Sequence, residues 1–227
     1  MGLRHVDDGL WIVDSNFRSW GCRVSIRMTV MKTEAGLLLH SPVHVEADGV
    51  AAINRLGSVH AIIAPNLYHH FHVRNCAALF VKARVLVPEG LEAKVGPIPR
   101  AEVMANDATL DLPTDVEHLV VSGHSMLRET LLFHRPTATL VTADLIYNYH
   151  AEHHLAERSF FRLIGCYGAP KVAFYHAFSI QSRDVALELI EVVRRWKPRR
   201  IIMSHGRIIE DEQAAELFAA AWTPFTH

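Results

Sequence analysis

The first third of the chain is a series of short apolar or alternating runs, a pattern typical of β-strands. Such runs occupy residues 10–13, 27–32 and 37–40. The last two flank Thr33–Gly36, a turn-like tetrad that ends in glycine. This spacing predicts a β-hairpin.

The next segment changes from a period of two to helical spacing. Apolar residues recur at helical intervals from Val45 to Leu56, and Gly57 follows as a suitable helix terminator. The run from His60 to Ala64 then predicts a buried strand. Pro65-Asn66 ends it, because proline cannot donate to a central ladder and the pair favours a turn. The chain therefore leaves the sheet just before Tyr68–His72.

The remaining chain repeats this order coarsely. Further strands are predicted over residues 84–88, 117–121, 129–134, 138–144 and 200–204, and further helices over residues 75–82, 150–165, 183–196 and 212–221. The stretch that follows the first of these strands, from residue 89 to Pro113, is predicted to be loops. Two halves that each carry hairpins, a helix and a strand predict an α/β fold, a four-layer αββα sandwich.

Composition narrows the class of protein. The 227 residues are 50% hydrophobic, enough for one sizeable core, and no linker is evident, so one domain over residues 1–227 is predicted. Lys and Arg total 23 against 24 Asp and Glu. This balance argues against a general nucleic-acid or anionic-membrane partner and favours a small-molecule substrate. The oligomeric state is left open.

Location and redox state follow from the apolar runs and the cysteines. The apolar stretches are shorter than the roughly 20 residues that span a bilayer, and no signal-peptide pattern precedes them, so we expect a cytoplasmic protein. Cys22, Cys76 and Cys166 are widely spaced, as expected for reduced core thiols. A GxSxG elbow, a Walker loop and a GxGxxG turn are absent, which excludes the corresponding hydrolase, NTPase and dinucleotide-binding motifs.

Sixteen histidines direct attention to metal chemistry. Imidazole is the commonest protein metal ligand, and several histidines follow predicted strands, where the side chains of distant segments converge. The candidate ligands at these strand ends are His69, His70, His72, His124, Asp144 and His205. Of the first three, His70 and His72 are the better chelating pair if the chain stays extended, because residues two apart then face the same side.

A divalent ion held by such side chains would support hydrolysis. Catalytic zinc keeps about three His or carboxylate ligands and one open position for water. Zn²⁺ is the expected ion, with Mn²⁺ or Fe²⁺ as alternatives and no metal at all as a further one. Asp144 completes the ligand sphere or orients the attacking water. Tyr68 and Asn66 are the candidate substrate contacts.

The order of these motifs resembles the metallo-β-lactamase-fold hydrolases, which include glyoxalase II and many lactonases, thioesterases and nucleases. Gly123-His124 resembles the family's third ligand motif, and Leu140–Leu145 resembles its LxTGD strand with Ala143 in place of glycine. His205 falls where the last histidine of the family is expected. The resemblance implies that His124 and His205 are ligands and that Asp144 bridges two metals.

The first motif departs from that family. The first motif of the family is His-x-His-x-Asp-His. The register of the preceding strand places Asn66, Tyr68, His70 and Phe71 at its four defined positions, and none of them matches in that register. A shift of four residues places His70 and His72 on the leading histidines, but then Arg74 and Asn75 stand at the Asp and His positions. The chain therefore resembles a divergent branch that lacks the ordinary first motif.

Two functions remain open from the sequence. The first is a metal-dependent hydrolase with an atypical, single-ion site and an unknown substrate. The alternative is a non-catalytic binding protein that keeps the fold and has lost its metals. The histidines of the inserted segment, His150, His153, His154 and His176, are expected mostly on exposed helix surface.

Overall fold

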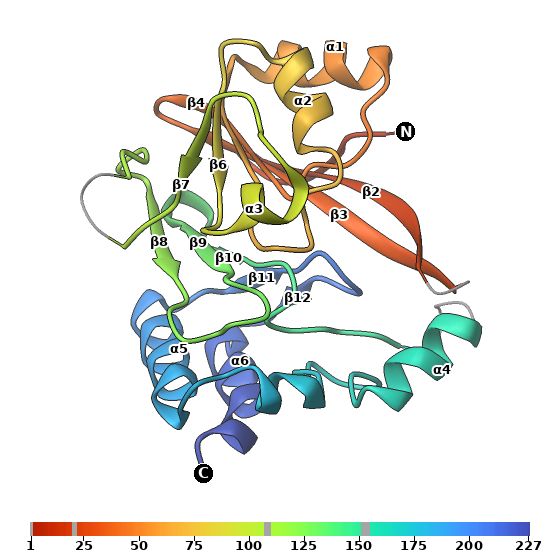
Figure 1. The fold of residues 1–227 in the computed structure, drawn as a ribbon, viewed down its shortest axis with the longest axis vertical. Helices are drawn as coiled ribbons and strands as arrows, with labels where there is room; N and C mark the ends of the chain where they lie inside the picture. The colour runs from red at the N-terminus through yellow and green to blue at the C-terminus, as the bar shows by residue number, and fades with distance from the viewer. Residues whose placement is uncertain (1, 20–21, 107–109, 151–154) are drawn as a thin grey trace.

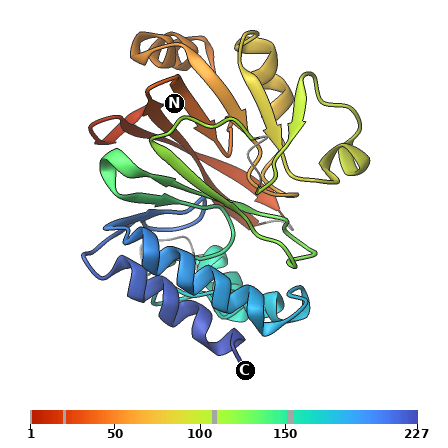
Figure 2. The ribbon, with the colours of Figure 1, turned by 90° about the vertical axis from the view of Figure 1, so that its left-hand side faces the viewer.

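Two β-sheets lie face to face, with helices on both outer sides (Figures 1 and 2). The computed structural model describes residues 2–19, 22–106, 110–150 and 155–227. The predicted αββα sandwich is confirmed by these four layers. Residues 151–154, including the predicted helix positions His153 and His154, lie outside the described residues.

The larger sheet is built from the first half of the described chain. Its strands, in spatial order, are β1 (Arg4–Asp7), β2 (Leu10–Ser19), β3 (Cys22–Thr33), β4 (Gly36–His40), β5 (Val59–Ile63), β6 (Arg84–Val87) and β7 (Ala101–Val103). Neighbours are antiparallel from β1 to β4 and parallel from β4 to β7. The predicted hairpin is β3–β4, in which Thr33 pairs with Gly36.

The smaller sheet comes from the second half. In spatial order it contains β12 (Ile209–Glu210), β11 (Arg200–Ile202), β10 (Thr139–Val141), β9 (Thr130–His134) and β8 (Val116–Val120). β10 and β11 run parallel, and the other neighbours are antiparallel. This parallel pair brings two distant parts of the sequence to one edge.

The helices cover the outer faces of the sheets. They are α1 (Ala47–Leu56), α2 (Val73–Leu79), α3 (Leu91–Val95), α4 (Leu155–Leu163), α5 (Arg183–Trp196) and α6 (Ala214–Trp222), with 3₁₀ turns at Arg135–Thr137, Phe174–Phe178 and Thr223–Phe225. Figure 1 shows α1 to α3 over the larger sheet, α5 and α6 under the smaller one, and α4 beside the far end of β3. None of these helices is both long and apolar enough to cross a bilayer.

Alternation along the strands sorts the apolar side chains into separate core layers. In β5, Ala61 and Ile63 point to the layer between the sheets, whereas Ile62 points to the layer beneath α1 and α2. In β9, Leu132 faces the other sheet and Leu131 faces α5 and α6. Both faces of each sheet are thus buried, which explains why the strands are almost continuously apolar.

The segment from residue 89 to Pro113 differs from the prediction of loops. It contains the helix α3 and the strand β7, which pairs in parallel with β6 at the edge of the sheet. Both elements are too short to give a periodic signal, at five and three residues. β7 depends on its ladder with β6 rather than on a local pattern.

Candidate metal centre

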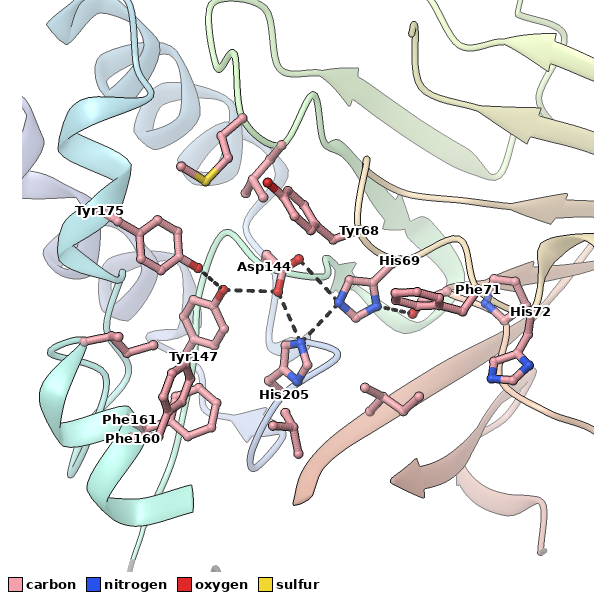
Figure 3. Close-up of a pocket in the computed structure, with 17 residues that line it drawn as sticks. Tyr68, His69, Phe71, His72, Asp144, Tyr147, Phe160, Phe161, Tyr175 and His205 are labelled. Carbon is pink, nitrogen blue, oxygen red and sulfur yellow. Dashed lines mark hydrogen bonds and ion pairs between the residues drawn. The ribbon is translucent and has the colours of Figure 1, made fainter. Parts of the chain in front are cut away.

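Two imidazole rings and one carboxylate meet at the same edge of the two sheets. The Nε2 atoms of His69 and His205 lie 3.1 Å apart. Asp144 faces both rings, with Oδ2 at 3.3 Å from Nε2 of His69 and Oδ1 at 3.2 Å from Nε2 of His205. Figure 3 shows the three side chains pointing toward one another. Residues that are far apart in sequence thus form one cluster with metal-ligand chemistry.

Strand pairing explains why Asp144 and His205 are neighbours. β10 and β11 are parallel, with Val141 opposite Ile202. Asp144 and His205 each lie three positions past those paired residues. Because parallel strands end at the same edge of a sheet, both side chains leave the sheet there.

The loop that carries His69 is joined to Asp144 by Asn66. The side-chain oxygen of Asn66 accepts hydrogen bonds from the backbone N–H groups of Tyr68 and His69, at 2.8 and 2.9 Å. Its amide nitrogen donates to Oδ2 of Asp144 at 2.8 Å and to Oε2 of Glu129 at 2.7 Å. Asn66 therefore fixes the loop and the carboxylate relative to each other.

This position corrects the expectation that Asn66 contacts substrate. The side chain is fully buried and does not line the cavity described below. The sequence could not show this, because both side-chain polar atoms of Asn66 bond to groups within the protein that only the tertiary structure brings near. Tyr68, in contrast, is 45% exposed and lines the cavity, so its role as a substrate contact stays a prediction.

Glu129 is a second buried carboxylate that the sequence did not single out. It accepts hydrogen bonds from the hydroxyl of Thr142 at 2.5 Å, from the N–H of Ala143 at 2.7 Å and from the N–H of Asp144 at 2.9 Å, besides the amide of Asn66. Hairpin register is the signal that could have found it. His134 pairs with Thr139 across β9–β10, and the same register continued places Glu129 opposite Asp144.

Each histidine of the cluster is oriented through its other ring nitrogen. Nδ1 of His205 donates to the backbone carbonyl of Ser25 at 2.7 Å, which leaves its Nε2 without a proton when the ring is neutral. Nδ1 of His69 lies 2.8 Å from the hydroxyl of Ser41, which in turn accepts a hydrogen bond from Ser204 at 3.2 Å. Such contacts fix ring orientation and tautomer in metal sites.

The loop around His205 is held by Arg27 and by a glycine. The guanidinium of Arg27 donates to the carbonyls of Met203 and Gly206, both at 3.1 Å, and to Asp14 at 2.6 Å. Gly206 has φ of 90° and pairs with Asn148. A Cβ atom at this position would collide with the carbonyl of Asn148. Only glycine fits this turn without strain.

The charges of the cluster reinforce one another. Burial opposes ionisation of Asp144, but the two adjacent imidazoles outweigh it and hold the pKa of Asp144 well below its usual range. Burial also opposes protonation of His69, yet the carboxylates of Asp144 and Glu129 outweigh that effect and raise the pKa of His69. Burial and the nearby Asp144 raise the pKa of Glu129. The cluster therefore favours an ionised Asp144 beside a histidine that binds its proton more tightly than usual.

The other candidate ligands of the first loop lie outside this cluster. His70 packs against Phe71, with ring centroids 4.6 Å apart, and His72 lies 5.9 Å from the ring of His44. The preference for His70 and His72 assumed an extended chain, but residues 69–72 form turns. The turns direct His69 to Asp144 instead. His72 still lines the cavity.

His124 is paired with a second buried histidine rather than with Asp144. Its Nε2 lies 2.8 Å from Nδ1 of His176 and 3.3 Å from the hydroxyl of Ser179. Burial lowers the pKa of His124 to about 4 and that of His176 to about 3. His176 is fully buried, contrary to the expectation of an exposed helix residue, because its 3₁₀ turn packs it against Trp222.

A cavity of about 470 Å³ opens above the cluster. It is lined by Val24, Ile26, Ser41, Pro42, Tyr68, His69, Phe71, His72, Met126, Leu127, Asp144, Tyr147, Phe160, Phe161, Ile164, Tyr175 and His205. The volume is in the range of small-molecule sites, about 300–1,000 Å³. Figure 3 shows the cluster between Tyr147, Phe160 and Phe161 on one side and Phe71 and His72 on the other.

Two tyrosines extend the hydrogen-bond network from the cluster into the cavity wall. The hydroxyl of Tyr147 donates to Oδ1 of Asp144 at 3.1 Å and lies 2.7 Å from the hydroxyl of Tyr175. Because the single proton of Tyr147 goes to Asp144, Tyr175 donates to Tyr147. Burial and the charge of Asp144 raise the pKa of both tyrosines, so both stay protonated.

The donor atoms fit one divalent ion. Two ligands that each lie about 2.0–2.2 Å from an ion, at angles of about 90–110°, are roughly 2.8–3.6 Å apart. The contacts of 3.1, 3.2 and 3.3 Å among His69, Asp144 and His205 fall in this range. Two imidazoles and one carboxylate on one face leave further coordination positions open toward the cavity.

Comparisons with solved structures show which fold this is. A metallo-β-lactamase from Pontibacter korlensis is 13% identical, with a TM-score of 0.66 over 97% of this chain and 98% of that chain. The metallo-β-lactamase FIM-1 from Pseudomonas aeruginosa, in its mono-zinc form, is 10% identical, with a TM-score of 0.65 over 99% and 96%. The peroxy diiron species of the chemotaxis sensor ODP is 16% identical, with a TM-score of 0.59 over 98% and 95%.

At these identities the likeness establishes the metallo-β-lactamase fold, which the motif order predicts. The comparison with curated proteins gives no match. Residues 7–154 match the model of a family described as a domain of unknown function, DUF4336. This match covers β2 to β10 and includes two of the three clustered side chains, His69 and Asp144. The chain therefore belongs to the DUF4336 family, with the fold of the metallo-β-lactamases.

Proposed function

We propose that this protein is a hydrolase that uses a single divalent metal ion held by His69, Asp144 and His205. The observation that carries the proposal is the close triangle of donor atoms at the floor of a small-molecule cavity, with contacts of 3.1 to 3.3 Å. Zn²⁺ is the proposed ion, with Mn²⁺ and Fe²⁺ as alternatives. The mono-zinc FIM-1 structure supports one-ion occupancy in this fold.

The chain supplies binding, orientation and a largely apolar environment. When bound, a divalent ion supplies Lewis-acid chemistry: it lowers the pKa of water and polarises a carbonyl or phosphoryl oxygen. Asp144 presents two oxygens to the same space, so one would hold the ion and the other would be free to orient a water molecule by accepting its hydrogen bond. Tyr147 and Asn66 keep the carboxylate in this orientation by donating to its two oxygens.

The ligand set differs from the one implied by the family resemblance. His124 would have to leave its contact with His176 in order to bind an ion beside Asp144. We therefore propose three protein ligands and one ion rather than two ions bridged by Asp144. The alternative of a metal-free binding protein is an outcome of the experiment below.

The experiment measures thermal stability and hydrolysis after metal removal. Protein purified without a His tag is stripped with a chelator, and Zn²⁺, Mn²⁺ or anaerobic Fe²⁺ is added back. An ion at about 100 times its Kd stabilises the folded state by about 2.7 kcal/mol, which appears as a rise in melting temperature. The same ion should restore turnover of a panel of chromogenic esters and phosphoesters.

Single-residue variants test which side chains hold the ion and support turnover. His69→Ala and His205→Ala are expected to abolish both the metal-dependent rise in melting temperature and the turnover. His72→Ala is the matched control, because His72 lines the same cavity outside the cluster and its loss should leave both responses intact. A melting temperature that is independent of every ion would reject the proposal in favour of the non-catalytic alternative.

A further inference from the structure

The walls of the cavity are apolar on three sides. Val24 and Ile26 contribute from β3, Phe160 and Phe161 from α4, and Leu127 from the loop after β8. Phe161 is buried beneath Tyr149, with ring centroids 3.5 Å apart, so this wall is fixed by packing. Polar groups are concentrated at the floor, around His69, Asp144 and His205.

No lysine or arginine is among the described residues that line the cavity. Cations next to the lining residues contact aromatic rings instead of entering the cavity. Lys94 lies over the ring of Tyr68, 4.0 Å from its centroid, and donates to the carbonyl of Leu67 at 2.7 Å. On α4, Arg158 and Arg162 both lie over the ring of Tyr167, outside the cavity.

The lack of a lysine or arginine along this described lining disfavours a substrate that places an anionic group in the body of the cavity, away from the floor. The carboxyl group of Asp144 lies at the floor of the cavity, and the carboxyl group of Glu129 lies directly beneath it, where it accepts a hydrogen bond from the backbone N–H of Asp144. A phosphate or carboxylate group in the body of the cavity would be desolvated by apolar walls without a protein cation to pair with it. A neutral group with apolar substituents meets no such cost, and it removes the apolar walls from water.

We propose that the substrate is a neutral ester of an apolar acyl group, with the ester carbonyl at the floor and the acyl chain between β3 and α4. This inference rests on the proposed hydrolase function. In the reaction, the oxygen of water forms a bond to the acyl carbon and the acyl–oxygen bond breaks. The products are a carboxylic acid and an alcohol, and the alcohol oxygen takes one proton from the water.

Exposed aromatic residues at the mouth extend the apolar wall outward. Phe160 is 37% exposed and Phe71 is 60% exposed, and both line the cavity. They lie on opposite sides of the cluster in Figure 3. Acyl chains of medium length therefore stay in contact with apolar surface along their whole length.

The first test is the dependence of kcat/KM on acyl length in the metal-loaded protein. The substrates are the p-nitrophenyl esters of acetate, butyrate and octanoate, with bis(p-nitrophenyl) phosphate as the anionic comparison. Burying a methylene is worth about fourfold, so kcat/KM is expected to rise on the order of tenfold from acetate to butyrate. Equal rates for all esters, or a preference for the phosphodiester, would overturn the inference.

The second test places a charge on the proposed wall. Phe160→Lys should lower kcat/KM for the octanoate ester at least tenfold and the value for acetate much less, while Phe160→Leu should restore the preference for long chains. Leu163→Lys is the matched control, since Leu163 lies on the same helix, is 77% exposed and does not line the cavity. An equal effect of both lysines would contradict the assignment of this wall.

A binding measurement separates this inference from the proposed function. The neutral fluorophore N-phenyl-1-naphthylamine is titrated into the metal-free protein and into both lysine variants. We expect binding that Phe160→Lys weakens at least tenfold and Leu163→Lys leaves unchanged. If the fluorophore binds in this way but no metal-dependent turnover is found, the proposed hydrolase function is rejected and the apolar ligand preference of the cavity is retained. Metal-dependent turnover without fluorophore binding or chain-length preference would reject the apolar substrate and keep the hydrolase.

Discussion

Asp144 depends on neighbours that do not look like site residues in the sequence. Its two oxygens face two imidazoles, a tyrosine hydroxyl and the amide of Asn66, and its backbone N–H is bound by Glu129. Asp144 and His205 are predictable because each follows an apolar strand. The role of Asn66 is not predictable in this way, because it depends on Glu129, a partner 63 positions away.

The partner of His124 is equally hidden from the sequence. The position of His124 after a strand and its likeness to a ligand motif are visible in the sequence, but its choice of partner is a matter of tertiary packing. His176, 52 positions away, lies 2.8 Å from it. No pattern along the chain distinguishes a histidine that faces Asp144 from one that faces another buried histidine.

The hydroxyl of Ser41 should contribute to metal affinity through His69. Ser41 has φ of 56°, an uncommon conformation for a residue other than glycine, and its hydroxyl lies 2.8 Å from Nδ1 of His69. Ser41→Ala is expected to weaken metal binding about 10–100-fold, which a competition titration with a chromophoric chelator measures. Ser41→Gly suits the backbone better and also lacks the hydroxyl. Tight binding by the glycine variant would show that the backbone, not the hydrogen bond, is responsible.

At the scale of elements, the parallel pair β10–β11 positions two of the three clustered side chains. Both strands are predictable from their apolar runs, although each is only three residues long in the structure. The elements α3 and β7 are not predictable in this way, because neither belongs to a continuous apolar run. The turn after β11 requires a glycine, and the sequence shows one directly after His205.

Replacing that glycine should distort the His205 turn. Gly206→Ala is expected to cost about 1–3 kcal/mol of unfolding free energy, because the new Cβ atom meets the backbone of Asn148 at a φ of 90°. Urea unfolding measures the loss. Gly168→Ala is the matched control, with φ of 86° and open space around the added carbon. If the two variants lose equal unfolding free energy, the collision with Asn148 does not cause the destabilisation of Gly206→Ala.

At the scale of the whole molecule, two sheets share an inner core and are joined by polar contacts as well. The layer between them contains Met31 and Leu38 from the larger sheet and Leu132 from the smaller one. His134 in β9 bridges the sheets, because its Nε2 donates to the carbonyl of Lys32 in β3 at 3.0 Å. The sandwich was predictable, because the apolar alternation of each strand has to be buried on both faces.

The bridging histidine predicts a pH dependence of stability. Burial lowers the pKa of His134 below its usual 6.5, so the folded state binds this proton less well than the unfolded state. The stabilisation is complete above pH 6.5 and is lost progressively as the pH falls below it, because the unfolded state then binds the proton more tightly than the folded state. Urea unfolding between pH 7 and pH 5 should show a smaller fall for His134→Gln than for the wild type. The exposed His227→Gln should follow the wild type, and equal slopes for all three proteins would exclude this role for His134.

The most direct test of the metal site is an anomalous-difference map. Crystals are grown from protein purified without a His tag, and data are collected on both sides of the absorption edge of the ion found in the sample. We predict one peak per chain, within bonding distance of Nε2 of His69, Nε2 of His205 and a carboxylate oxygen of Asp144. A map without a peak between these three side chains, or with its peak at His124 and His176, would contradict the proposed site.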